Sequence, residues 1–181
     1  LIADTAGGLG DKDLIVVASG TMDIKLATSS ADAEAAASAL AAQVQRLRDH
    51  GAKYVLVMLP LNLKYMPFVG GNAATATAME TYSMAFVNTA KSEYPAGLYT
   101  APSTTQGSPV RVVDLMRNFN LIASGVSSGY SNITTPACTA AAADITLLNG
   151  CDSTAANADY ATSLFADNLN LTPALNRWVG A

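Results

Sequence analysis

Few side chains in this sequence could carry out nucleophilic or metal chemistry. Its 181 residues include one histidine, His50, and two cysteines, Cys138 and Cys151. The cysteines share one stretch rich in Thr, Ala and Asn, and the histidine lies far from them in sequence. We predict a disulfide between Cys138 and Cys151, which indicates an oxidising compartment. Two free thiols, or a metal site completed by further ligands, are the alternatives.

The elements that must position any site are predicted from hydrophobic patterning. The continuous apolar run Leu14–Ala18 is typical of a strand buried on both faces of a parallel sheet, and Tyr54–Leu59 is predicted as a second strand. Between them Ser30 can cap a helix that reaches about His50, with Ala36, Leu40, Val44 and Leu47 on its inner side. At that helix end, His50 is expected to fill a surface capping position rather than a catalytic one.

The rest of the chain continues the alternation of strands and helices. Further helices are expected over Thr75–Tyr94, Met116–Ala123 and Thr172–Trp178, further strands over Leu98–Thr100 and Val110–Leu115, and a loop-like tip over Ser19–Asp23. This order predicts one α/β domain over residues 1–181, a three-layer doubly wound parallel sheet. Because few strands are predicted and Leu1 is not an initiator Met, we expect a partial or processed chain that lacks its N-terminal strands.

Composition narrows the classes of partner. The net charge is −4 and charged residues make up 13% of the chain, about half the usual share. A surface without a basic field disfavours nucleic acid as a partner, and no apolar run is long enough to span a membrane. Scarce charge together with a loop disulfide predicts a secreted or cell-surface protein, and no cofactor or metal is expected.

Four short motifs follow one another along the chain. They are Gly20-Thr21-Met22-Asp23 after the first strand, Gly51-Ala52-Lys53-Tyr54 leading into a strand that ends in Leu59-Pro60, Val110-Arg111-Val112-Val113-Asp114, and Phe165-Ala166-Asp167 with Asn170-Leu171-Thr172. As an ordered set they resemble the C-terminal part of the SGNH (GDSL-type) hydrolases, especially the secreted and autotransporter-like esterases. Another doubly wound α/β family is the alternative.

The resemblance implies a catalytic apparatus that this chain largely lacks. Such esterases use a serine in a Gly-Asp-Ser block, a histidine base, an aspartate that orients it, and an oxyanion-binding asparagine. No Gly-Asp-Ser triplet occurs here. Asn170 stands at the position of the base and Met22 at that of the oxyanion asparagine, which leaves Asp167 as a remnant beside the scaffold residues Gly20 and Asp23.

These replacements predict a catalytically degenerate extracellular domain with a binding or assembly role. The alternative is a fragment of a carboxylic ester hydrolase whose serine lies on a missing N-terminal segment; a carbohydrate- or lipid-binding module is a third possibility. Expected partners are that segment or another protein chain, as a homo-oligomer or larger assembly. The stretch with Lys64, Tyr65, Met66 and Phe68 follows a strand tip and is a possible interaction surface, with ordinary packing as the alternative.

Overall fold

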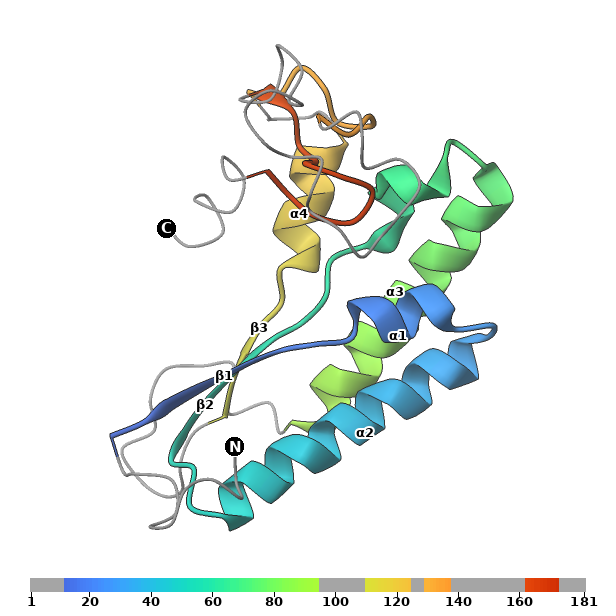
Figure 1. Cartoon of the computed structure of the whole chain (residues 1–181). Coiled ribbons are helices and arrows are strands. Elements are labelled where there is room, and N and C mark those ends of the chain that lie inside the picture. Colours follow the sequence, from blue (N-terminus) through green and yellow to red (C-terminus); the bar gives the residue numbers. More distant parts are fainter. Residues whose placement is uncertain (1–11, 95–109, 125–128, 138–161, 173–181) are drawn as a thin grey trace. The chain divides into compact units, whose positions relative to one another are not determined.

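A computed structural model describes residues 12–94, 110–124, 129–137 and 162–172 (Figure 1). The chain divides into two compact units. The first comprises residues 1–61 and 79–116, and the second comprises residues 62–78 and 117–181. The expectation of a single domain over residues 1–181 stays a prediction.

The first unit is built on a parallel sheet of three strands. These are β1 (Leu14–Ala18), β2 (Tyr54–Met58) and β3 (Val110–Val113), in the order β1-β2-β3. The register places Val16 beside Leu56 and Leu56 beside Arg111. An α/β architecture with a parallel sheet is therefore confirmed, and the strands lie where the apolar runs predicted them.

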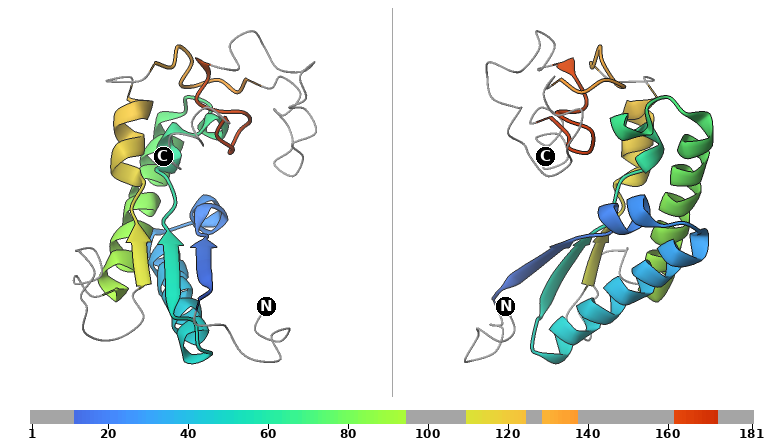
Figure 2. Two further views of the ribbon diagram at one scale, coloured as in Figure 1. Left: turned by 90° about the vertical axis from the view of Figure 1, so that its left-hand side faces the viewer. Right: turned by 45° about the vertical axis from the view of Figure 1, so that its right-hand side comes forward.

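Two long helices cover one face of this sheet (Figure 2). Helix α2 (Ser30–Asp49) follows β1, and α3 (Ala73–Glu93) follows β2. The buried side chains of α2 are Ala33, Ala37, Leu40 and Val44, and those of α3 include Met79, Phe86, Val87 and Ala90. The predicted inner side of α2 is right at Leu40 and Val44, whereas Ala36 and Leu47 are only half-buried.

Helix α2 begins one residue earlier than its predicted cap implies. Ser29, not Ser30, is the N-cap, and its Oγ accepts a hydrogen bond from the Asp32 backbone N–H at 3.2 Å. Asp32 reaches back, and its Oδ2 accepts from the backbone N–H and the hydroxyl of Thr28 at 2.9 and 2.7 Å. The reciprocal pair satisfies donors at the helix start, and the position of Asp32 decides which serine is the cap.

The tip of β1 is helical rather than loop-like. Residues Thr21–Leu26 form α1, whose backbone bond from Ile24 N to Gly20 O measures 2.9 Å. Ile24 is fully buried, so one apolar contact into the core stabilises this six-residue helix. A helix this short has too few turns to display a periodic pattern in the sequence.

The second unit contains short elements around aromatic side chains. Its 3-10 turns η2 (Leu63–Tyr65) and η3 (Pro67–Val69) follow β2 in sequence, and α4 (Met116–Ala123) has the predicted bounds. Phe119 of α4 packs edge-to-face against Tyr65 and Phe165, with ring centroids 6.1 and 6.2 Å apart. Phe165 and its neighbour Leu164 are completely buried.

Several predicted features lie outside the described residues. They are the strand Leu98–Thr100, the helix Thr172–Trp178 apart from its first residue, and both cysteines of the predicted disulfide, Cys138 and Cys151. Across the described part of the chain, every helix is too short or too polar to span a membrane.

Candidate functional site

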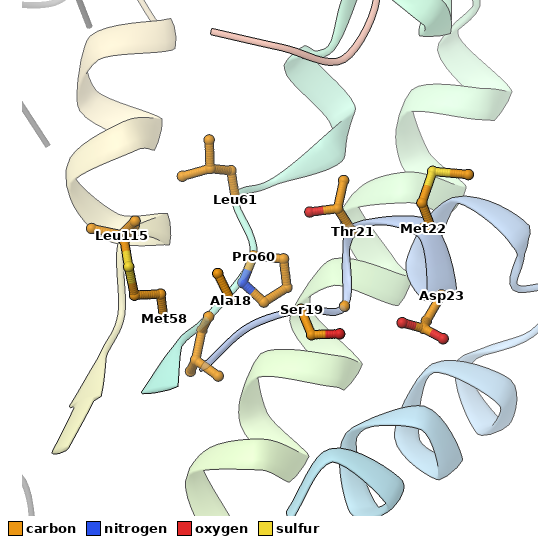
Figure 3. A pocket seen from close by; sticks show the side chains of 11 residues that line it. Ala18, Ser19, Thr21, Met22, Asp23, Met58, Pro60, Leu61 and Leu115 are labelled. Carbon is orange, nitrogen blue, oxygen red and sulfur yellow. The ribbon is translucent and has the colours of Figure 1, made fainter. Parts of the chain in front are cut away.

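A pocket of about 390 Å³ lies at the carboxyl ends of the strands in the first unit (Figure 3). This is the edge where open α/β sheets bind ligands, because the loops that follow the strands converge there. The hydroxyls of Ser19 and Thr21 and the carboxylate of Asp23 contribute its polar groups. Its apolar lining comes from Ala18, Met22, Met58, Leu59, Pro60, Leu61 and Leu115.

The predicted oxyanion remnant, Gly20, Met22 and Asp23, lines this pocket as one group. Met22 is 44% exposed, and its thioether has no hydrogen to donate. Asp23 is an exposed acceptor in the first turn of α1. The group therefore offers no side-chain donor at Met22, where the resemblance would place the oxyanion asparagine.

The local structure explains why residue 20 is a glycine. It is buried, with φ of 110°, a conformation that residues with a side chain rarely adopt. A Cβ added at Gly20 would lie 2.5 Å from Cζ of Phe86, which is 1% exposed. The chain turns from β1 into α1 directly against this ring, so only glycine fits without a shift.

Asp167 and Asn170, the second predicted remnant, are in direct contact in the second unit. The Asn170 side-chain amide donates from Nδ2 to Asp167 Oδ2 at 2.7 Å. Asp167 Oδ1 accepts from the backbone N–H of Asn170 at 2.6 Å and of Leu169 at 2.8 Å. Asp167 is 7% exposed, so these three donors satisfy a nearly buried carboxylate.

This contact has the connectivity of an aspartate that orients a base, but the partner is a carboxamide. An amide donates through Nδ2, as a histidine ring N–H would, yet it has no basic nitrogen to accept a proton near neutral pH. The Asp167–Asn170 pair lies in the second unit and the Gly20–Asp23 group lies in the first. The structure thus brings each remnant together within its own unit.

The residues of the predicted interaction surface differ in how deeply they are buried. Met66 is 3% exposed and therefore a packing residue, whereas Lys64, Tyr65 and Phe68 are half-buried. Lys64 Nζ lies 4.8 Å from the centroid of the Tyr65 ring, a cation–π contact. Lys64, Tyr65 and Met66 line a hollow of about 560 Å³ in the second unit, together with Ile133 and the three residues after it.

Of the remaining sequence candidates, His50 lies within the described residues, whereas Cys138 and Cys151 do not. His50 is the exposed C-cap of α2, and its backbone N–H donates to Arg46 O at 3.1 Å, which agrees with the expected capping position. Among the described residues, no three acidic, histidine or cysteine side chains gather where they could hold a metal ion.

A second candidate surface is the sheet face opposite α2 and α3. Alternation along the strands and the parallel register place Leu14, Val16, Ala18, Tyr54, Leu56, Met58, Arg111 and Val113 on this face. Leu14 is 62%, Val16 53% and Tyr54 47% exposed. On the face toward the helices, Val55 and Val57 are fully buried, and Ile15 and Val17 are half-buried.

The expectation that Leu14–Ala18 is buried on both faces is therefore wrong for the outer face. No described helix of the first unit lies on that side of the sheet (Figure 2). A continuous apolar run does not reveal which face of a short sheet is left exposed. Sequence reasoning also missed Ser19, Thr21 and the Phe86 ring behind Gly20 as parts of the site. The only signal of these three residues in the sequence was their position beside a strand tip or on a helix.

Comparison with known proteins does not identify a family for this chain. Neither a scan against models of known protein families nor a search of curated proteins gives a match for this chain.

Proposed function

We propose that this chain is a catalytically degenerate SGNH-like domain of the cell exterior that acts in binding or assembly rather than in ester hydrolysis. One observation carries the proposal: Asn170 donates its amide to Asp167 at 2.7 Å, at the position that the resemblance assigns to the catalytic base. Without a base, a serine hydroxyl supplied from elsewhere would not be activated.

Met22 supports the same conclusion from the other remnant. Loss of one oxyanion-hole donor costs on the order of 3 kcal/mol of transition-state stabilisation, or a hundred- to a thousandfold in rate. Loss of the catalytic base would lower the rate of hydrolysis further. An efficient esterase is incompatible with both changes, whichever segment supplied a serine.

The sheet supports a three-layer, doubly wound arrangement as part of this proposal. Crossovers between parallel strands are almost always right-handed, so two successive steps in one direction, β1 to β2 to β3, place both helices on one face. A doubly wound sheet also has a half that steps the other way and covers the opposite face. The open apolar face is where such a layer would pack, and it offers a surface for assembly.

The proposal is tested with a serine-directed fluorophosphonate probe and with hydrolysis of p-nitrophenyl butyrate. The purified chain should not be labelled and should not hydrolyse the ester above the uncatalysed rate. Turnover at ordinary enzymatic speed by homogeneous material would refute the proposal.

Two substitutions ask whether a serine-bearing segment acts with this chain. In a chain that includes any upstream serine-bearing segment, Asn170→His together with Met22→Asn should raise ester hydrolysis if the old cleft is intact, and no gain would imply that the cleft itself has decayed. Asn168→His is the matched control, since it adds an imidazole two residues before Asn170. A large gain in the double variant, absent from the control, would tie the loss of activity to these two residues, whereas hydrolysis by the unmodified chain together with that segment would favour the esterase fragment.

A further inference from the structure

The polar side chains at the strand-tip pocket take no part in holding the fold together. Within the described part of the chain, the Ser19 and Thr21 hydroxyls and the Asp23 carboxylate make no hydrogen bond or ion pair. Other exposed carboxylates do, since Asp32 and Asp49 each accept a hydrogen bond at 2.7 Å from a side chain four residues away. No lysine or arginine lines the pocket, so none of its side chains balances the negative charge.

The pocket has a polar side and an apolar side. The polar residues follow β1, whereas Pro60 and Leu61 follow β2 and Leu115 follows β3. We call these last three residues the apolar wall. Figure 3 shows the Ser19 hydroxyl pointing toward the Asp23 carboxylate, and no hydrogen bond joins these two described side chains. A donor group placed between the two would bond to oxygen atoms of both.

The ligand that matches this arrangement is a cation with N–H donors and an apolar tail. An ammonium group brings three donors and a positive charge. Its hydrogen bond to a carboxylate is charge-assisted and about twice as strong as a bond between neutral groups. An apolar tail leaves water when it packs against the apolar wall. The pocket of about 390 Å³ has room for about a dozen water molecules, so a six-carbon amine fits into it.

We propose that the strand-tip pocket binds a small primary alkylammonium ligand, with the ammonium group between Asp23 and Ser19 and the alkyl group against the apolar wall. This inference rests on the proposed function, since it names the ligand class for the binding role of that domain. The place agrees with the general behaviour of open α/β sheets, which bind ligands at the carboxyl ends of their strands.

Four ligands of equal chain length separate charge, donors and tail. They are hexylammonium, hexyltrimethylammonium, hexanol and hexanoate, each titrated into the purified, nitrogen-15-labelled chain and followed by amide NMR shifts. Hexylammonium should give saturable shifts that are largest for residues 19–23, and it should bind on the order of tenfold more tightly than hexanol. Hexyltrimethylammonium keeps the charge without an N–H donor and should bind more weakly than hexylammonium. Hexanoate should give no saturable shift, because Asp23 repels its carboxylate.

Three variants connect the binding to this pocket. Asp23→Asn should lower the affinity for hexylammonium on the order of tenfold and leave that for hexanol unchanged. Ser19→Ala removes the second acceptor and should lower the affinity for hexylammonium by a smaller factor. Glu34→Gln removes the same charge from an exposed position of α2 and should bind as the unmodified chain does. All three side chains are exposed, and circular dichroism checks that each variant is folded.

The inference is overturned if hexylammonium gives no saturable shift, if hexanol or hexyltrimethylammonium binds as tightly, or if Asp23→Asn leaves the affinity unchanged. Equal losses in Asp23→Asn and Glu34→Gln would show a general attraction of cations to an anionic chain and would overturn it as well. The probe-labelling and ester assays are independent of these titrations. Failure here would leave the non-catalytic assignment standing, whereas rapid ester turnover would refute the proposed function whichever amine binds.

Discussion

The close approach of Gly20 to Phe86 gives the most specific prediction about the strand tips. Gly20→Ala places a Cβ 2.5, 2.8 and 3.1 Å from three ring atoms of Phe86 and keeps φ at 110°. An L-residue with positive φ costs about 1–2 kcal/mol. Inserting a methyl group into a packed core costs about 1–3 kcal/mol more, since the buried ring must shift. Gly20→Ala should therefore lower the free energy of unfolding by about 2–5 kcal/mol.

Gly70 separates the two contributions. It also has positive φ, 63°, but a Cβ there would have no atom within 4 Å. Gly70→Ala should therefore cost only the conformational part, about 1–2 kcal/mol. The difference between the two variants isolates the contact with Phe86.

Urea unfolding followed by circular dichroism measures both losses, and a thermal scan should shift by about 2–4 °C per kcal/mol at this chain length. A double-mutant cycle with Phe86→Leu completes the test, because a smaller side chain relieves the clash. Gly20→Ala should then cost less in the Phe86→Leu background than in the unmodified chain. Equal losses for Gly20→Ala and Gly70→Ala, with no coupling to Phe86, would refute the reasoning.

Two further predictions concern carboxylates that organise helix starts. Hydrogen bonds from the Thr28 hydroxyl, then from the Thr28 backbone, lower the pKa of Asp32. The stabilisation of α2 by the Asp32 carboxylate is therefore complete above the unfolded pKa of about 3.9 and is lost as the pH falls through the lower folded pKa. An NMR titration of the Asp32 carboxyl should give a depressed midpoint that rises in the Thr28→Val variant, and a midpoint unchanged by that substitution would contradict this. The Asp114 carboxylate pairs with Lys91 at 2.7 Å and also accepts a hydrogen bond from the Met116 backbone N–H at 3.0 Å. In urea unfolding, Asp114→Ala should lower the free energy of unfolding by about 1–2 kcal/mol, because it removes both contacts. Lys91→Met removes only the ion pair and should lower it by at most about 1 kcal/mol. Equal costs would show that the backbone bond contributes nothing.

The fold could be predicted from the sequence where burial produces a strong pattern. The continuous apolar runs of β1 and β2 lie within one residue of the observed strands, and α4 has the predicted bounds. Helix α1 could not be predicted, because six residues are too few for a periodic pattern and its only anchor is Ile24. The choice of Ser29 over Ser30 as cap was likewise hidden, since it depends on which serine hydroxyl the Asp32 backbone N–H reaches.

The residues of the predicted remnants could be named from the sequence, but their surroundings could not. Asp167 precedes Asn170 by three residues in the sequence. In the structure their side chains are hydrogen-bonded, with Asn170 Nδ2 2.7 Å from Asp167 Oδ2. The exposed face of β1 was not predictable from its run of apolar residues, because such a run indicates burial without saying what provides it. Exposure of Leu14 and Val16 is a property of the layers around the strand, not of the strand's own sequence.

The two remnant residues differ in what they reveal about function. Asp167 closes a turn with two backbone donors and one side-chain donor, so a purely structural need accounts for an aspartate there. Its presence is therefore no argument for catalysis. Asn170 is different, because a histidine could satisfy Asp167 equally well through a ring N–H and would add a base. A carboxamide meets the structural need and omits the chemistry, so under the proposed resemblance the identity of residue 170, rather than of residue 167, would distinguish an esterase from a binding domain.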